Sequence, residues 1–138
     1  MSAKILVPGG AGYIGSVLVP LLVDEGFDVT VVDNFLYGQA SLNQLAGRKN
    51  FHIARIDVRN HSALAPYIAK ADIVVPLAAL VGAPLCDQNP VDAELVNLRH
   101  PIALFGSKSH DQICIKPTTE SAYGPMPRYA RKKPRSTH

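Results

Sequence analysis

A glycine-rich stretch near the N-terminus constrains the fold of this chain more than any other feature. Residues 9–15 read Gly-Gly-Ala-Gly-Tyr-Ile-Gly; they follow an apolar run at residues 5–7 and open an apolar-periodic stretch. A second run, at residues 29–32, is rich in valine and ends at Asp33. A strand, a glycine turn, a helix and a strand that ends in a carboxylate form the layout that binds a dinucleotide. The sequence therefore predicts a dinucleotide site at this turn.

The glycine turn suits a pyrophosphate for two physical reasons. Glycines let the backbone turn tightly and come close to the anion. The helix that begins near Gly12 would direct its free N–H groups and the positive end of its dipole toward the same anion. The expected cofactor contacts in this turn are Gly9, Gly12, Tyr13, Ile14 and Gly15.

Asp33 decides which dinucleotide is expected. Its carboxylate can accept hydrogen bonds from both hydroxyls of the adenosine ribose, and its charge would repel a 2′-phosphate. We therefore expect NAD rather than NADP. The competing interpretation, that Asp33 is only a turn residue at the end of a strand, is disfavoured by the glycine motif that precedes it.

Strand-like and helical patterns alternate along the chain. Strand-like runs lie at residues 4–7, 28–33, 51–57, 71–76 and 112–116. Several are nearly continuous in Val, Ile and Leu, which is typical of strands buried on both faces of a parallel sheet. Helical patterns lie between them, at residues 14–22 (with Pro20 expected to kink the helix), 41–45 and 61–68. The alternation predicts an α/β fold with a doubly wound parallel sheet in the order 3-2-1-4-5, a partial Rossmann fold.

A fourth helical pattern, at residues 91–104, is interrupted by its own composition. Pro90 suits a first helical turn, but Pro101 and Gly106 fall where the helix would continue. Proline removes a backbone donor and collides with the preceding turn, so this helix is expected to break or fray near residues 99–101.

Basic residues are concentrated at the end of the chain. Residues 125–138 contain five Lys or Arg and no acid, so this tail has a formal charge of +5. Residues 1–124 contain 9 basic and 11 acidic residues and have a charge of −2, which together give the net charge of +3. The periodic pattern stops after Gly124. We expect an NAD-binding domain over residues 1–124 and a disordered basic tail over residues 125–138. A nucleic-acid role would rest on that tail alone, without aromatic stacking positions, and is not expected.

Other function classes are disfavoured by composition. No apolar run approaches the roughly 20 residues that span a bilayer, so no membrane association is expected. The N-terminus lacks a basic segment followed by an apolar stretch and a cleavage site. Cys86 and Cys114 form no metal or redox pattern, and they are expected to be reduced thiols in a cytoplasmic protein.

An ordered series of motifs resembles the N-terminal part of the extended short-chain dehydrogenases/reductases that act as nucleotide-sugar epimerases and dehydratases. That family opens with Thr-Gly-Gly-Ala-Gly-(Phe/Tyr)-Ile-Gly, and this chain differs only by Pro8 in place of the threonine. The resemblance extends over about residues 3–124 and ends at Thr-Thr-Glu-Ser-Ala-Tyr-Gly, residues 118–124. The cofactor contacts that the resemblance adds are Asn34, Asp57, Val58, Leu77, Ala78, Ala79 and Asn97.

The resemblance also implies roles for several of these residues. Asp57 and Val58 would flank the adenine ring, although a capping or turn role for Asp57 competes with this interpretation. Residues 77–79 are small or apolar residues that would let the backbone pass close to the cofactor, although composition alone would place them in the core. Asn97 would support that loop through a side-chain hydrogen bond, but an ordinary asparagine on a helix surface fits nearly as well.

The catalytic residues of the family are matched less completely than its cofactor contacts. Thr119 aligns with the family's catalytic Ser/Thr, which hydrogen-bonds the sugar hydroxyl that is oxidised. The family's acid/base is the tyrosine of a Tyr-x-x-x-Lys motif on the next helix. Tyr129 and Lys133 match it formally, but only ten residues after Thr119 and in a proline-flanked basic segment with no apolar helical face, so coincidence is the favoured interpretation.

The basic tail has a further possible origin. One set of codons for residues 128–138, read in a shifted frame, gives Val-Cys-Thr-Glu-Glu-Thr-Pro-Leu-Asn-Pro, which resembles the segment that precedes the family's catalytic helix. This compatibility suggests a frameshift near Gly124 that truncated the chain. The DNA downstream of the Gly124 codon tests the hypothesis. A Tyr-x-x-x-Lys region recovered there in a shifted reading frame would support it, and the absence of such a region in that frame would reject it.

Two functions from different classes remain open at this point. The favoured one is an NAD-binding domain of a nucleotide-sugar epimerase or dehydratase, with a nucleotide sugar as the substrate of the intact family but no credible base in this chain. The alternative is a non-catalytic NAD-binding module or partner subunit. A homodimer is possible in either case. If the chain shows no response to NAD in a binding titration, a third interpretation is favoured, that of a degenerate fragment that no longer folds fully.

Overall fold

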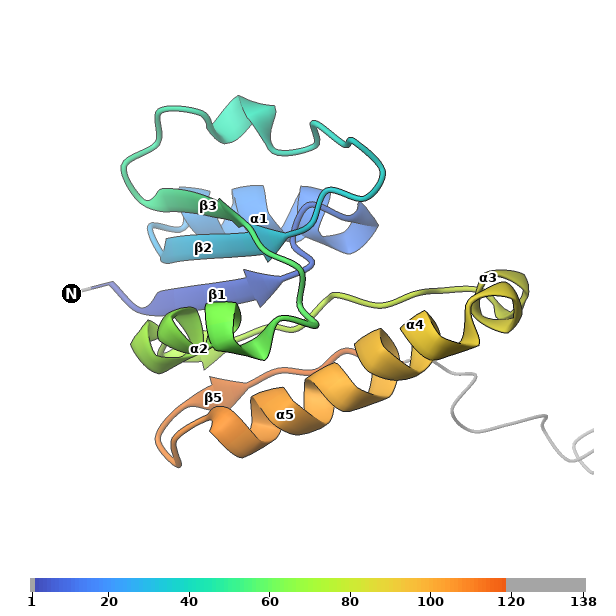
Figure 1. The fold of residues 1–138 in the computed structure, drawn as a ribbon. Helices are drawn as coiled ribbons and strands as arrows, with labels where there is room; N and C mark the ends of the chain where they lie inside the picture. The colour runs from blue at the N-terminus through green and yellow to red at the C-terminus, as the bar shows by residue number, and fades with distance from the viewer. Residues whose placement is uncertain (1, 119–138) are drawn as a thin grey trace, which may run out of the picture.

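A parallel sheet organises the chain, as the computed structural model shows for residues 2–118, the part of the chain that the structure describes. The strands are β1 (Lys4–Pro8), β2 (Asp28–Asp33), β3 (Phe51–Arg55), β4 (Ile73–Val74) and β5 (Ile113–Cys114). Their spatial order is β3-β2-β1-β4-β5, and every neighbouring pair is parallel. The predicted fold class and strand order are therefore confirmed (Figure 1).

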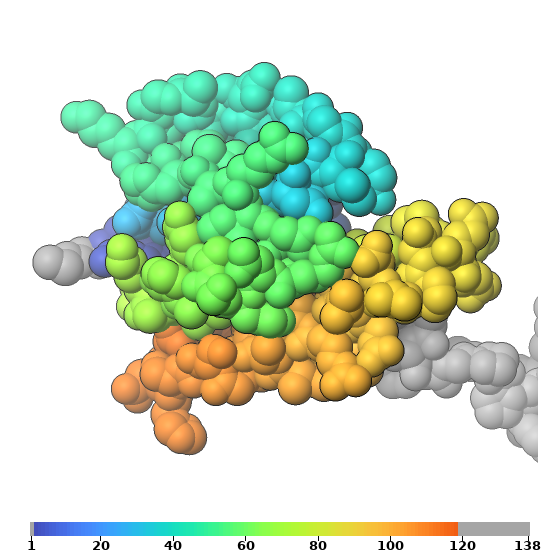
Figure 2. Space-filling view, in the orientation of Figure 1, coloured from blue at the N-terminus to red at the C-terminus, as the bar shows by residue number. Residues whose placement is uncertain are grey.

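Helices cover both faces of this sheet. On one face lie α1 (Tyr13–Asp24) and the short 3₁₀ turn η1 (Asn43–Leu45); on the other lie α2 (His61–Lys70) and α5 (His100–Ser107) (Figure 1). Figure 2 looks onto the second face, where α2 and α5 pack side by side. The layers follow from the strands themselves, because successive side chains of a strand point to opposite faces.

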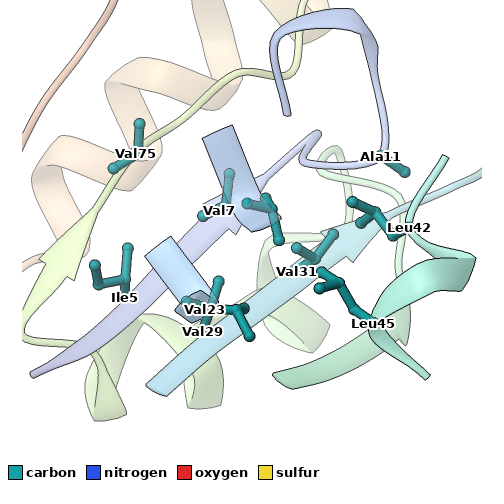
Figure 3. Close-up of a cluster of buried hydrophobic side chains, with 10 residues drawn as sticks. Ile5, Val7, Ala11, Val23, Val29, Val31, Leu42, Leu45 and Val75 are labelled. Atoms are coloured by element: carbon teal, nitrogen blue, oxygen red, sulfur yellow. The ribbon is translucent and has the colours of Figure 1, made fainter. Parts of the chain in front are cut away.

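Two apolar clusters result from this alternation. Ile5 and Val7 of β1 join Val19 and Val23 of α1 in the first cluster, which Figure 3 shows together with Leu45 of η1. Leu6, between them in sequence, joins a second cluster on the opposite face. The other buried members of that cluster are Val32, Leu64, Ile68, Ala71, Val74 and Leu104.

Three strands are shorter than the sequence predicts, and proline explains the case of β4. Gly9 donates to the Val32 carbonyl of β2 (2.8 Å), so in a parallel ladder the N–H of the residue before it would point to β4. That residue is Pro8, which has no N–H. Pro76 lacks one as well, and the β4 ladder stops after Val74. The runs at 51–57 and 112–116 also extend beyond their strands, and the pattern at 41–45 forms only a single 3₁₀ turn.

The helical segment over residues 90–107 corrects one prediction. The expected break near residues 99–101 does not occur, because α4 (Pro90–Glu94), a π-helical turn η2 (Leu95–Arg99) and α5 follow one another directly. The ring of Pro101 would collide with the carbonyl four residues earlier, that of Asn97. A wider turn before the proline avoids this collision, as seen in the His100 N–H that donates to the carbonyl of Leu95, five residues back.

Two further helical features complete the described fold. A short helix, α3 (Ala83–Gln88), precedes α4, and α1 runs through Pro20 without interruption. None of the helices in residues 2–118 is long and apolar enough to cross a membrane.

Candidate functional site

The predicted cofactor residues meet at the carboxyl ends of the strands. The glycine turn follows β1, Asp33 ends β2, Asp57 follows β3 and the loop at residues 77–79 follows β4. From β1 the chain continues to β2 and β3 on one side, and the connection from β3 then crosses to β4 on the other side of β1 (Figure 1). Ligands of open α/β sheets bind at the point where the strand order reverses in this way. Thr119 and the Tyr129–Lys133 match lie outside the described residues.

Close backbone contacts explain the glycines of the turn. Gly9 has a φ of 76°, in the left-handed region, and a Cβ there would lie 2.5 Å from the Cα of Ala78. A Cβ on Gly15 would overlap the carbonyl group of Gly10. Gly10 is not among the cofactor contacts predicted from the sequence, but a Cβ added there would meet the side chain of Val31 at 2.9 Å. The turn is therefore held between β2 and the loop after β4, with no room for side chains at these positions.

The start of α1 has the free donors that an anion requires. Its first helical bond runs from the Ser16 N–H to the Gly12 carbonyl (2.9 Å), and the N–H groups of Tyr13, Ile14 and Gly15 have no acceptor within residues 2–118. Within that described part of the chain no side chain caps this end, and the first turn contains no acid. Free donors at a helix N-terminus, beside a turn without side chains, fit a dinucleotide pyrophosphate.

Asp33 joins the end of β2 to the glycine turn. Its side chain is buried; Oδ2 accepts from the Ala11 N–H (3.0 Å) and Oδ1 from the Phe35 N–H (2.9 Å). The structural role that competed with ribose binding is thus present. The two roles are compatible, since each carboxylate oxygen has two acceptor positions and only one is used. Ribose binding by Asp33 stays a prediction.

The carboxylate of Asp57 accepts four hydrogen bonds, three of them from Arg59. Oδ1 accepts from the backbone N–H and the Nε of Arg59 (both 2.9 Å), and Oδ2 accepts from Nη2 of Arg59 (2.7 Å) and Nδ2 of Asn34 (3.3 Å). The hydrogen bonds from Arg59 hold the pKa of Asp57 well below its usual range, and they raise the pKa of Arg59 in turn. The side chain of Val58 is buried. Asp57 therefore has the turn role that sequence analysis left open.

The loop after β4 is held from both sides. The N–H groups of Leu77 and Ala78 donate to the Pro8 carbonyl at 2.7 and 2.9 Å. Asn97 bonds Leu80 twice, because its Oδ1 accepts from the Leu80 N–H and its Nδ2 donates to the Leu80 carbonyl, both at 2.8 Å. The expected side-chain hydrogen bond from Asn97 to this loop is present. A direct contact between Asn97 or Ala79 and a cofactor stays a prediction.

Two further polar residues near the candidate site, Arg59 and His100, were not predicted from the sequence. Arg59 follows the expected adenine pair and bridges Asp57 to Asp92 of α4; the Asp-Val-Arg order was its only signal. His100 at the start of α5 is fully buried and stacks on His61 with ring centroids 5.8 Å apart. Burial lowers the pKa of His100 to about 4, and the nearby charges of His61 and Lys116 act in the same direction.

Known proteins are similar to this chain in sequence. A profile of the NAD dependent epimerase/dehydratase family matches residues 5–137, beyond the domain end expected at residue 124. UDP-glucuronic acid decarboxylase 1 of Danio rerio is 30% identical over 123 residues, which are 88% of this chain and 28% of that protein. UDP-glucose 4-epimerase 2 of Arabidopsis thaliana is 34% identical over 125 residues, covering 79% of this chain and 35% of that protein.

Solved structures agree with these relatives. The UDP-N-acetylglucosamine 4-epimerase from Methanobrevibacter ruminantium M1, in complex with UDP-N-acetylmuramic acid, has a TM-score of 0.79 at 27% identity and covers 96% of this chain and 43% of that one. The UDP-glucose-4-epimerase from Stenotrophomonas maltophila, with bound NAD and formylated UDP-arabinopyranose, has a TM-score of 0.76 at 28% identity and covers 88% and 38%. The chain thus spans less than half the length of the relatives it matches.

Proposed function

The chain belongs to the NAD-dependent epimerase/dehydratase family, and from this premise we propose that it binds NAD as the dinucleotide-binding portion of a nucleotide-sugar epimerase or dehydratase. The observation that carries the proposal is the free N-terminus of α1. Its unused N–H groups open onto a glycine turn whose close packing excludes side chains.

On this proposal, different described residues would bind different parts of NAD. The glycine turn and the first turn of α1 would hold the pyrophosphate, Asp33 the adenosine ribose, and Asp57 with Val58 the adenine end. Ala78 and its neighbours would approach the nicotinamide half, with Asn97 as the support of their loop. NAD, when bound in this family, accepts a hydride from the sugar; Thr119 would hydrogen-bond the hydroxyl that is oxidised.

NAD is expected to bind in preference to NADP. The carboxylate of Asp33 has no basic side chain among its hydrogen-bond partners within residues 2–118, and placing a 2′-phosphate beside it costs a few kcal/mol, so NADP should bind on the order of 100-fold more weakly. Thermal-shift and fluorescence titrations of the full chain measure both affinities, and AMP with 2′-phosphorylated AMP forms a matched ligand pair. Equal affinity for the two dinucleotides would reject the role of Asp33, and absence of any NAD effect would reject the proposed function.

The alternative function is a non-catalytic NAD-binding module or partner subunit. The sequence around Tyr129 and Lys133 supports it, because that segment is basic and proline-flanked and lacks an apolar helical face. On this proposal the chain by itself binds NAD but turns over no nucleotide sugar. An assay of purified chain with UDP- and dTDP-hexoses separates the two functions, since any turnover would show that the chain carries a complete catalytic set.

We further propose that the chain forms a homodimer through the helical segment over residues 90–107. Its support is a row of exposed apolar side chains at alternating spacings of four and three residues. They are Val91, Leu95, Leu98, Ile102 and Phe105. Replacing Leu98 with glutamate should convert the dimer to monomer in sedimentation velocity, because a charge would be buried at the interface. Val81→Glu, at a still more exposed apolar residue outside the row, should leave the dimer intact. A wild-type monomer would contradict the proposal.

A further inference from the structure

A cavity lies at the end of the sheet opposite the glycine turn. It has a volume of about 240 Å³ and opens between the last turn of α2 and the amino-terminal halves of β1, β2 and β3. The helix α2 runs back along the sheet to reach this end (Figure 1). Lys4 and Gly9 are separated by the length of β1, about 16 Å at the rise of an extended strand. The cavity is therefore separate from the proposed NAD site.

Strand alternation places the lining residues of the sheet on one face. Leu6 pairs with Thr30, and Thr30 pairs in turn with His52 across the three parallel strands. Lys4 and Asp28, the pair two residues earlier, share this face because every second side chain of a strand points to the same side. Leu6 belongs to the apolar cluster that packs against α2. The whole row therefore faces α2.

The floor of the cavity is apolar and its rim is cationic. Leu6 and Ala71 are buried and form the floor with the half-buried ring of Tyr67. Lys4 of β1 and Lys70 in the last turn of α2 lie at the exposed rim. Within residues 2–118, neither ammonium group has a carboxylate oxygen within 4 Å. Both charges are thus available to an anion that enters from solvent.

Two hydroxyl groups add further donors to this lining. The hydroxyls of Thr30 and Tyr67 make no hydrogen bond to another residue of the described chain, so they can donate to a ligand. Asp28, the acid among the lining residues, is paired with Nε2 of His52 at 2.9 Å. The polar groups left for a ligand are therefore two ammonium groups and two hydroxyls.

We propose that this cavity binds a small monocarboxylate with an apolar body, a function that goes beyond NAD binding. The lysines and hydroxyls would donate charge-assisted hydrogen bonds to the carboxylate, and the apolar floor would cover the rest of the molecule. An inorganic phosphate would leave that floor uncovered. The volume equals that of about eight water molecules at roughly 30 Å³ each, which fits a ligand of about nine non-hydrogen atoms.

Benzoate is the probe for this site, and benzamide is its matched neutral control, because the two have the same shape and differ in charge. In an NMR titration of isotope-labelled full chain, benzoate should bind with a Kd on the order of 1 mM. It should shift the backbone amides of Thr30, His52 and Lys70. Benzamide should bind about tenfold more weakly, since it lacks the charged acceptor. Saturating NAD should leave the benzoate affinity unchanged, because the two sites lie at opposite ends of β1.

Lys70→Met tests the role of the cationic rim. The variant should bind benzoate about threefold more weakly, the size expected for one exposed ion pair, while its affinity for benzamide stays the same. Lys49→Met is the matched control, since Lys49 is an exposed lysine that does not line the cavity. It should bind both ligands as the wild-type chain does. Thermal unfolding verifies that each variant is folded before the titration.

The outcomes are distinct. Selective binding of benzoate at the lining residues, weakened in Lys70→Met but not in Lys49→Met, would support the proposal. Failure to saturate below about 20 mM benzoate would overturn it, because so weak an association would not be a specific site. Equal affinities for benzoate and benzamide, unchanged benzoate binding in Lys70→Met, or shifts confined to residues 9–15 would also overturn it.

Discussion

Replacing Gly9 with alanine is expected to lower the free energy of unfolding by about 3 kcal/mol and to abolish the response to NAD. The left-handed φ of 76° costs an alanine roughly 1–2 kcal/mol. The new Cβ would also overlap the backbone of Ala78, and forcing a methyl group into a close-packed position costs roughly 1–3 kcal/mol more. The turn and the loop after β4 would have to separate, which would disturb the N–H groups that we propose bind the pyrophosphate. Urea unfolding and an NAD thermal shift measure the two effects.

Gly26→Ala isolates the effect of the close contact from that of backbone conformation. Gly26 follows α1 with a φ of 87°, close to that of Gly9, but a Cβ there would have no heavy atom within 4 Å. This variant should lose only about 1–2 kcal/mol and should keep its full NAD response. Equal losses of stability in the two variants, or an undiminished NAD response in Gly9→Ala, would show that the contact with Ala78 does not shape the site.

Acidification from pH 6.5 to pH 4 is expected to lower the free energy of unfolding by roughly 2–3 kcal/mol through His100 alone. Burial favours the neutral ring and lowers the pKa of His100 from 6.5 to about 4. In this pH range the unfolded chain therefore binds a proton that the folded chain does not, and the free energy of unfolding decreases as the pH decreases. Above pH 6.5 both states are neutral at this residue, and below pH 4 both are protonated, so its contribution levels off. Urea unfolding at a series of pH values measures the slope.

His100→Leu provides the control for this pH dependence. Leucine has a similar volume and no titratable group, and the His100 ring nitrogens have no hydrogen-bond partner of good geometry within residues 2–118, although the backbone of Val58 lies close enough to favour the protonated ring slightly. The variant should remain folded and should lose most of the slope between pH 6.5 and pH 4. A wild-type protein with constant stability over this range would contradict the buried neutral state of His100.

Some elements could be predicted because their signals are local. The glycine turn, the valine-rich run before Asp33 and the alternation of strands and helices each lie in one continuous stretch, and short stretches dictate periodicity and turn geometry. The helix over residues 90–107 could not be read in the same way. Its sequence shows Pro101 and therefore predicts a break, whereas a π-helical turn can accept the proline without ending the helix.

By itself, the sequence determined the parallel sheet, its strand order and the glycine turn after β1. The alternation of strands with helices implies right-handed crossovers, and the glycine spacing marks the turn. Only the tertiary structure decided which groups meet at the candidate site. Ala78 lies against Gly9, Asn97 holds Leu80, and Arg59 occupies Asp57 while it reaches Asp92. Most of these contacts join residues that are far apart along the chain. Their distances depend on how the strands and helices pack, and no local pattern records that packing.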